Sequence, residues 1–186
     1  MKKIASIVVL IIGLNTVIAQ EFELTNAYQV TINEVVTQEQ QPTMQGVLLS
    51  DAEQSLRLTT FPVEAAEQIE QITVSEFKNP GLQGIKNVLK IETRYVEFCS
   101  YLVSQYILVT KNGDFISLPS LGNTRCNDTS TEVQYLFPRQ KLGTTNQIVQ
   151  AEVGIVPTVK VNLVTQQIFI WKDDSFGTMS AISENN

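Results

Sequence analysis

The sequence contains no histidine, and this absence excludes several common kinds of active site. Nucleophilic sites of the Ser-His-Asp and Cys-His types need an imidazole as general base. Metal sites with histidine ligands, haem with a proximal histidine, and a histidine-based pH switch near neutrality are excluded for the same reason. The chemistry that remains uses carboxylates, Lys, Tyr or the backbone, and the chain has no Gly-x-Ser-x-Gly or phosphate-loop signature.

Charged residues are also scarce, at 17% of the 186 residues, whereas hydrophobic residues make up 43%. The charged fraction is low for a cytosolic domain. The hydrophobic content, together with the lack of any long block of one charge, argues against disorder. This composition predicts an ordered, β-rich protein that works outside the cytoplasm.

The start of the chain has the pattern of a secretory signal peptide. Lys2 and Lys3 form a positive start, and Ile4–Ile18 is an apolar run that polar residues interrupt near its end. The run is shorter than the ~20 residues of a membrane-spanning helix, and no positive stop-transfer cluster follows it. We therefore expect cleavage after residues 1–19, leaving residues 20–186 as a single secreted or periplasmic β-rich domain with no membrane span.

The mature chain is predicted to be strongly acidic. Removing the two leader lysines from the 13 Lys and Arg leaves 11 cations against 19 Asp and Glu, a net charge of −8. An acidic protein repels the phosphate backbone of nucleic acids and the surface of anionic membranes. We therefore expect a protein or carbohydrate partner and no nucleic acid.

The chain has only two cysteines, Cys99 and Cys126, and both lie in the part expected to be exported. In an oxidising compartment such a pair predicts one structural disulfide. Closing a loop of this length stabilises a fold by about 3.5 kcal/mol in the chain-entropy description. A redox or metal pair is not supported, because there is neither a Cys-x-x-Cys spacing nor a histidine.

Alternation of apolar and polar residues predicts strands along much of the mature chain. Residues 21–33 alternate almost strictly, and residues 149–155 and 159–163 do so again. Asn112-Gly113 lies between two apolar runs, which is the strongest short-range signal for a β-hairpin because both turn positions favour positive φ.

The helical signals are confined to residues 50–90. After Pro62, apolar residues recur at spacings of three and four as far as Ile72, with glutamates mostly on the other side. Leu82 to Leu89 indicates one or two further helical turns. The predicted fold class is α+β, mainly β, with an antiparallel sheet curled into a sandwich or open barrel and one or two short helices packed against it.

Pairs of acids are the catalytic route that needs no histidine, as in glycoside hydrolysis. Glu92 and Glu97 lie on one predicted strand but at opposite parity, so they face opposite ways. Lys90, Lys111 and Lys160 stand alone in the sequence and are predicted to be solvated. No set of residues converges, and we predict no catalytic residue.

Four residues near Cys126 carry the oxygen donors that calcium accepts: Asn123, Asn127, Asp128 and Glu132. Their spacing matches no calcium-binding loop, and such residues also form ordinary polar turns. We therefore predict neither a metal nor a cofactor.

The aromatic residues Phe169 and Trp171 share one face of a predicted strand, whose other face is also apolar. Aromatic residues in strands are most often part of the core, but a strand with two apolar faces can present one of them to a partner. Phe169 and Trp171 are therefore the candidate binding surface.

Taken together, these features predict an exported, non-catalytic binding or structural domain. A carboxylate-dependent hydrolase of an extracellular polymer is an alternative that requires two acids converging in a cleft. An inhibitor or chaperone of another exported protein is a second alternative.

Overall fold

A computed structural model of the chain describes residues 21–35, 43–50, 57–96, 100–125, 131–154, 164–172 and 175–179. Several predictions fall outside these residues and stay predictions. They concern the signal peptide, both cysteines and the side chains of Glu97, Asn127, Asp128 and Lys160.

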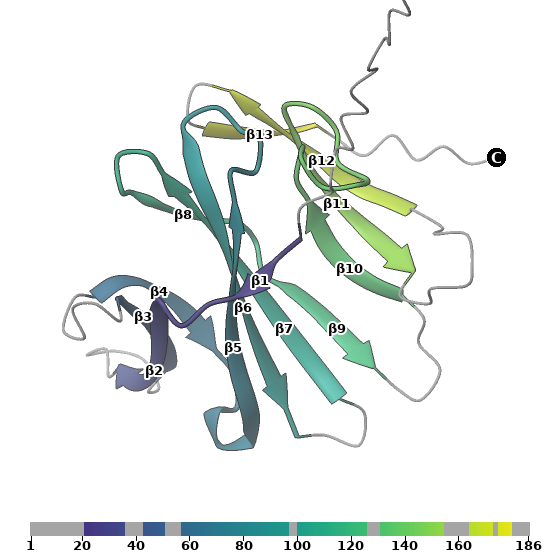
Figure 1. Cartoon of the computed structure of the whole chain (residues 1–186). Helices are drawn as coiled ribbons and strands as arrows, with labels where there is room; N and C mark the ends of the chain where they lie inside the picture. Colours follow the sequence, from purple (N-terminus) through teal and green to yellow (C-terminus); the bar gives the residue numbers. More distant parts are fainter. Residues whose placement is uncertain are drawn as a thin grey trace, which may run out of the picture.

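The described residues form thirteen strands in three antiparallel sheets (Figure 1). The central sheet contains β1 (Glu23–Leu24), β5 (Ile69–Lys78), β6 (Ile85–Tyr95), β7 (Ser100–Thr110), β8 (Phe115–Ser117) and β9 (Leu121–Arg125). A second sheet contains β10 (Thr131–Leu136), β11 (Gln147–Gly154), β12 (Val164–Lys172) and β13 (Ser175–Met179). A third sheet contains β2 (Tyr28–Val35), β3 (Thr43–Ser50) and β4 (Arg57–Val63). The expectation of an antiparallel, β-rich fold is confirmed.

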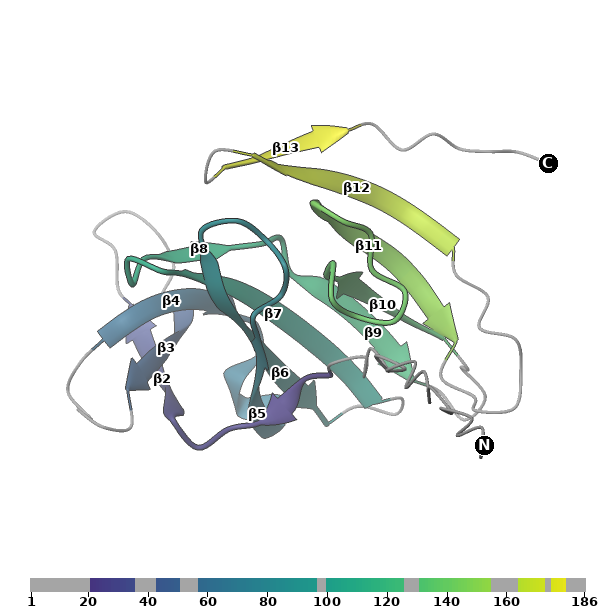
Figure 2. The same ribbon diagram turned by 45° about the horizontal axis from the view of Figure 1, so that its top comes forward.

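The central sheet lies between the other two, because successive side chains of a strand point to opposite faces. Leu89, Ile91 and Ile107 point to one face and form a buried cluster with residues of β3 and β4. Val88 and Leu108 point to the other face and pack against residues of β10–β12. Figure 2 shows the β10–β13 sheet curving over that second face.

An aromatic core joins the central sheet to the β10–β13 sheet. The Tyr106 ring meets the Tyr135 ring edge-on, with 5.0 Å between centroids, and Tyr135 meets Phe169 at 5.8 Å. Tyr106, Tyr135 and Phe169 are almost fully buried. Edge-to-face contacts of this kind add about 0.5–1.5 kcal/mol beyond the burial of apolar area.

The helices predicted in residues 50–90 are wrong for the described part of that range. The only helical element there is a 3₁₀ turn at Ala66–Gln68, which joins β4 to β5 after Ala65 adopts a positive φ of 42°. Ile69, Ile72 and Val74 are β-branched, and the pairing of β5 with β6, which in turn pairs with β7, decides their conformation. Leu82 lies in a turn between Gly81 and Gly84, both at positive φ, and β6 follows directly.

No helix among the described residues has the length and apolar character needed to span a membrane.

The hairpin predicted at Asn112-Gly113 is confirmed, with a different turn geometry. Gly113 has a φ of 93°, whereas Asn112 is not among the residues at positive φ. The Gly113 N–H donates to the Thr110 carbonyl at 3.1 Å, and the Thr110 N–H donates to the Asp114 carbonyl. This pattern is a type I turn followed by a glycine in the left-handed region, the second common way to close a hairpin.

The alternation predicted for residues 21–33 is confirmed for Tyr28, Val30 and Ile32, which are half-buried between exposed neighbours. The strand is nevertheless interrupted at residues 25–27. The first piece, β1, joins the central sheet and the second, β2, joins the β2–β4 sheet. Leu24 is 79% exposed, although its parity predicted burial.

Candidate functional site

One face of the central sheet has two parts. The aromatic core lies at one end of this face, and mostly polar side chains lie at the other end. Three neighbouring strands contribute them in register, so each row crosses β5, β6 and β7. The rows are Gln71–Arg94–Leu102, Thr73–Glu92–Ser104 and Ser75–Lys90–Tyr106. We call these nine residues the polar face.

Lys90 lies at the centre of an ion-pair network on the polar face. Its Nζ is 2.9 Å from Glu92 Oε1 and 3.5 Å from Glu132 Oε1, and it lies 5.7 Å from the centroid of the Tyr106 ring. The Lys90 side chain is only 11% exposed. The prediction that Lys90 is solvated is therefore wrong, because acids on two strands and an aromatic ring compensate for its burial.

The electrostatic surroundings keep Lys90 charged. Burial alone would lower the pKa of Lys90, but the Tyr106 phenol, Glu92 and Glu132 together raise it above its ordinary value. Burial also raises the pKa of Tyr106 to about 12, although the Lys90 ammonium opposes that change. At neutral pH the site therefore contains an ammonium and an uncharged phenol.

Two of the four predicted oxygen donors have structural roles. The Asn123 side chain donates to the Val133 carbonyl at 3.0 Å and accepts from the Val133 N–H at 2.8 Å. Glu132 bonds Lys90 across 42 residues of sequence. Both residues connect the β10–β13 sheet to the central sheet. Among the described residues, no group of three acids or cysteines could hold a metal ion.

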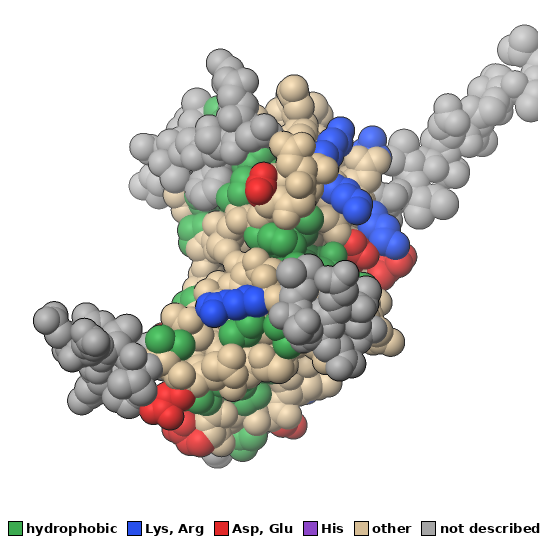
Figure 3. Space-filling model, turned by 90° about the vertical axis from the view of Figure 1, so that its left-hand side faces the viewer, with side chains coloured by type: hydrophobic (Ala, Val, Ile, Leu, Met, Phe, Trp, Pro, Cys, Tyr) green, Lys and Arg blue, Asp and Glu red, His purple; other side chains and the backbone are tan. Residues whose placement is uncertain are grey.

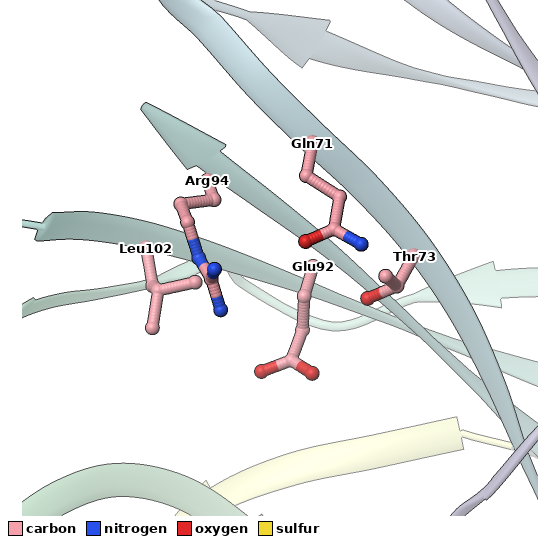
Figure 4. A pocket seen from close by; sticks show the side chains of 5 residues that line it. All are labelled: Gln71, Thr73, Glu92, Arg94 and Leu102. Atoms are coloured by element: carbon pink, nitrogen blue, oxygen red, sulfur yellow. The ribbon is translucent and has the colours of Figure 1, made fainter. Parts of the chain in front are cut away.

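A small hollow of about 120 Å³ opens beside this network (Figure 4). The guanidinium of Arg94 points into it, and Arg94 has no salt bridge with any described residue. Arg94 Nε and the nearby Ser104 Oγ are buried without a hydrogen-bond partner. Buried polar atoms are almost always paired. Of these two residues, Arg94 lines the hollow, so its guanidinium is the group that a ligand there can reach. The hollow is lined by Gln71, Thr73, Glu92, Arg94 and Leu102.

A larger groove of about 410 Å³ continues from the hollow, and Glu92 lines both. Its other walls come from residues 21–24 and from β10 and the turn after it, and include the side chains of Phe22, Gln134 and Gln140. Together the hollow and this groove form one surface, the polar groove. Its lining combines amides, hydroxyls, charges of both signs and a few apolar groups.

Glu92 and Glu132 converge, although the sequence paired Glu92 only with Glu97. Both carboxylates contact the same ammonium, so they lie close together across two sheets. A glycosidase needs one protonated acid and one free carboxylate on either side of its substrate. Here both acids pair with the Lys90 ammonium.

Phe169 and Trp171, the predicted binding surface, are only 2% and 5% exposed. Phe169 packs against Tyr135, and Trp171 Nε1 donates to the Gln83 carbonyl at 2.7 Å. Both belong to the core between the two large sheets, so neither offers a surface to a partner. The face of β12 that carries these two rings is covered by the core. The opposite face carries Ile168 and Ile170, which are half-buried. Both faces of the strand are therefore apolar.

Lys90 and Arg94 are the site residues that sequence reasoning missed. The available signal was their parity, since Lys90, Glu92 and Arg94 alternate with the buried residues Ile91 and Thr93. Three charges on one face of a strand that is otherwise buried indicate a polar site rather than a solvated edge.

No protein-family model, curated protein or solved structure matches this chain.

Proposed function

We propose that this protein is an exported, non-catalytic binding domain, and that the polar groove holds a carbohydrate ligand with a carboxylate. The observation that carries the proposal is Arg94, whose partly buried guanidinium faces the hollow with an unpaired Nε. Arginine is well suited to bind a carboxylate through two parallel hydrogen bonds.

Arg94 is the cation of the site that remains for an acidic group. Lys90 is already paired with Glu92 and Glu132, whereas Arg94 has no salt bridge with any described residue. The hollow has room for one sugar unit or one acid group, but not for a bulky side chain. Uncharged hydrogen-bonding groups surround it, including Gln71 and Thr73, and these suit sugar hydroxyls.

A matched pair of sugars tests the proposal. Glucuronic acid and glucose differ by one carboxylate, and NMR titration of the full mature chain at low salt measures both. We expect glucuronic acid to bind and to shift the Gln71 and Thr73 signals. Arg94→Gln should weaken binding by about ten-fold, the value of one lost charged hydrogen bond.

The control variant is Lys111→Gln, which removes an exposed cation in the hairpin turn, away from the groove. It should leave binding unchanged. Equal binding of both sugars, or an unaltered affinity in Arg94→Gln, would contradict the proposal.

A second candidate is a carboxylate-dependent hydrolase, favoured by the convergence of Glu92 and Glu132 on Lys90. It predicts release of reducing ends from a polyuronide, and loss of that release in Glu132→Gln. Absence of release from any uronide that binds would remove this candidate.

Export is proposed from the leader pattern, and a bridge between Cys99 and Cys126 is the prediction that goes with it. Ser100 and Arg125, the described neighbours of the two cysteines, are register partners in the β7–β9 ladder. Intact mass of the exported protein measures cleavage after residue 19 and the loss of two hydrogens by Cys99 and Cys126.

A further inference from the structure

The outer edge of β5 is open along most of its length. Within the described residues, only β1 pairs with this edge, through Glu23 opposite Glu76 and Leu24 opposite Ser75. One further bond follows, from the Thr25 N–H to the Val74 carbonyl at 3.1 Å. Beyond it the chain continues into β2, and no described strand is hydrogen-bonded to the outer edge of β5 from Ile69 to Thr73.

The backbone geometry identifies which groups face outwards. In a strand, the N–H and C=O of one residue point to the same side and those of the next residue point to the other. The Val74 carbonyl points to the outer side because Thr25 donates to it. The N–H and C=O of Ile72 therefore also point outwards, where a further strand would find them.

A groove of about 470 Å³ lies along this open edge, and β2 forms its other wall. Among the described residues β2 pairs only with β3, so the groove separates two strand edges. Its lining includes Leu24, which is 79% exposed, and half-buried Tyr28, Val30 and Ile72. Open edges in soluble proteins are usually protected by charged residues, Pro or a β-bulge. Glu70 and the bulge between Ile69 and Gln71 protect the first residues of β5, whereas residues 71–74 contain no charged residue and no Pro.

The two segments that border the groove carry charge of one sign, and exposed Arg57 lies two strands away on β4, in the row of Gln29 and Leu49. Residues 21–35 and 64–77 contain seven glutamates and no Lys or Arg. The nearest cation in the sequence, Lys78, already pairs with Glu76 at 3.8 Å. On the side of the molecule that carries β2–β4, acidic side chains gather along the lower edge (Figure 3). A second copy of this chain would place like charges together, whereas a basic segment would be attracted.

We propose that the outer edge of β5 binds an extended, lysine- or arginine-containing peptide segment of another protein as an added strand. The Ile72 N–H and C=O bond the segment, alternate apolar side chains enter the groove, and the basic side chains face the glutamates. This surface meets the polar groove at Leu24 and Thr73, which line both, and it supplies the protein-binding surface that an inhibitor or chaperone would need.

A synthetic probe tests the proposal with the full mature chain. The probe is acetyl-Lys-Val-Lys-Val-Lys-Val-Lys-amide, and the same peptide with glutamate in place of lysine is its charge-reversed control. We expect the lysine peptide to shift the amide signals of Ile72 and Val74 in an NMR titration and to bind more weakly as salt rises. The glutamate peptide should not bind.

Ile72→Pro removes the outward N–H, a change that edge strands tolerate because the N–H faces solvent. It should weaken binding by about ten-fold, whereas Ile72→Val keeps the N–H and should bind as the natural chain does. If Ile72→Pro does not fold, the natural chain is titrated instead with a probe whose valines are N-methylated. This probe should bind about ten-fold more weakly than the unmodified lysine peptide.

Three results would overturn the proposal. They are failure of the lysine peptide to bind, shifts confined to the polar groove, and unchanged affinity for the N-methylated probe. Concentration-dependent shifts at Ile72 without any peptide would instead assign the edge to a second copy of the chain.

Discussion

The two faces of the central sheet are built from the same strands but have different composition and surroundings. On β6, Leu89 and Ile91 enter a wholly apolar cluster with β3 and β4. Lys90 and Glu92, their chain neighbours, enter an ion-pair network beside the aromatic core. The apolar face contributes stability mainly through burial of its apolar side chains, and it also carries buried Thr93 and buried Gln105, the register partner of Ile91. The other face divides into an apolar part, which holds two sheets together, and a polar part, which holds the candidate site.

The difference also concerns how burial is compensated. A buried leucine needs only close packing. A buried ammonium loses its hydration, and it is tolerated because carboxylates and a ring replace the water. The polar face therefore depends on residues from separate strands, and losing Lys90 leaves both Glu92 and Glu132 without their shared cation.

The largest expected effect is on the apolar face. Leu89→Ala removes a fully buried side chain and should lower the free energy of unfolding by about 3 kcal/mol, through lost burial and the cavity that remains. Urea unfolding followed by circular dichroism measures this. Leu24→Ala is the matched control, because Leu24 is 79% exposed and its truncation should change stability little. Equal effects of the two variants would contradict the assignment of this face as core.

The next effect is on the polar face. Lys90→Met should lower the free energy of unfolding by about 3 kcal/mol at neutral pH, because Glu92 and Glu132 then face each other without a cation. Urea unfolding measures this cost. Lys86→Met, an exposed lysine on the same strand, is the control and should change stability little. Equal costs of the two variants would contradict the assignment of Lys90 to a buried ion-pair network.

A smaller effect concerns the connection between the two large sheets. Asn123→Ala should cost about 2 kcal/mol, because the buried N–H and C=O of Val133 both lose their partner. Hydrogen exchange should then show faster exchange of the Val133 amide than of the Leu108 amide in the central sheet. Asn123→Asp keeps an acceptor for the Val133 N–H and should protect that amide better than Asn123→Ala. Equal protection of the Val133 amide in both variants would contradict this role.

The smallest effect at neutral pH is expected at Tyr106. Tyr106→Phe removes one hydroxyl and should cost about 1 kcal/mol. The folded pKa of Tyr106 is raised to about 12, above the ordinary 10, so the folded state keeps its proton longer than the unfolded state. This contribution is complete below pH 10 and is lost as the pH rises to 12.

Unfolding measured from pH 8 to 12 therefore shows a loss of stability in the natural chain that Tyr106→Phe reduces. The raised pKa of Lys90 acts in the same direction, and its contribution is lost only above the ordinary lysine pKa of 10.5. An identical alkaline loss in the two proteins would contradict the raised pKa of Tyr106.

Short-range sequence patterns correctly predict the strands and turns that neighbouring residues specify. The alternation of Tyr28, Val30 and Ile32 and the turn at Asn112-Gly113 both act within a few residues. The segment from Pro62 to Ile72 was assigned wrongly because its apolar spacing fits a helix as well as a strand. Pairing with β6, which lies later in the chain, decides between them.

The candidate site was predicted less well than the fold. The parity of Lys90, Glu92 and Arg94 is visible in the sequence, but Glu132 comes from another sheet, 42 residues away from Lys90. Trp171 illustrates the opposite error, since an apolar residue that was assigned to a surface bonds Gln83 across 88 residues and is buried.

The sequence by itself determined the chemistry that is absent, the acidic balance and the strand-forming character of the chain, because composition and short-range periodicity do not depend on the fold. Only the tertiary structure decided which residues meet. Antiparallel pairing aligned Lys90 with Tyr106, and the packing of a second sheet brought Glu132 to the same ammonium. The missing histidine leaves this protein with lysine, arginine and carboxylates as its charged groups. Their partners come from distant strands, and long-range contacts of that kind have no signature in local sequence.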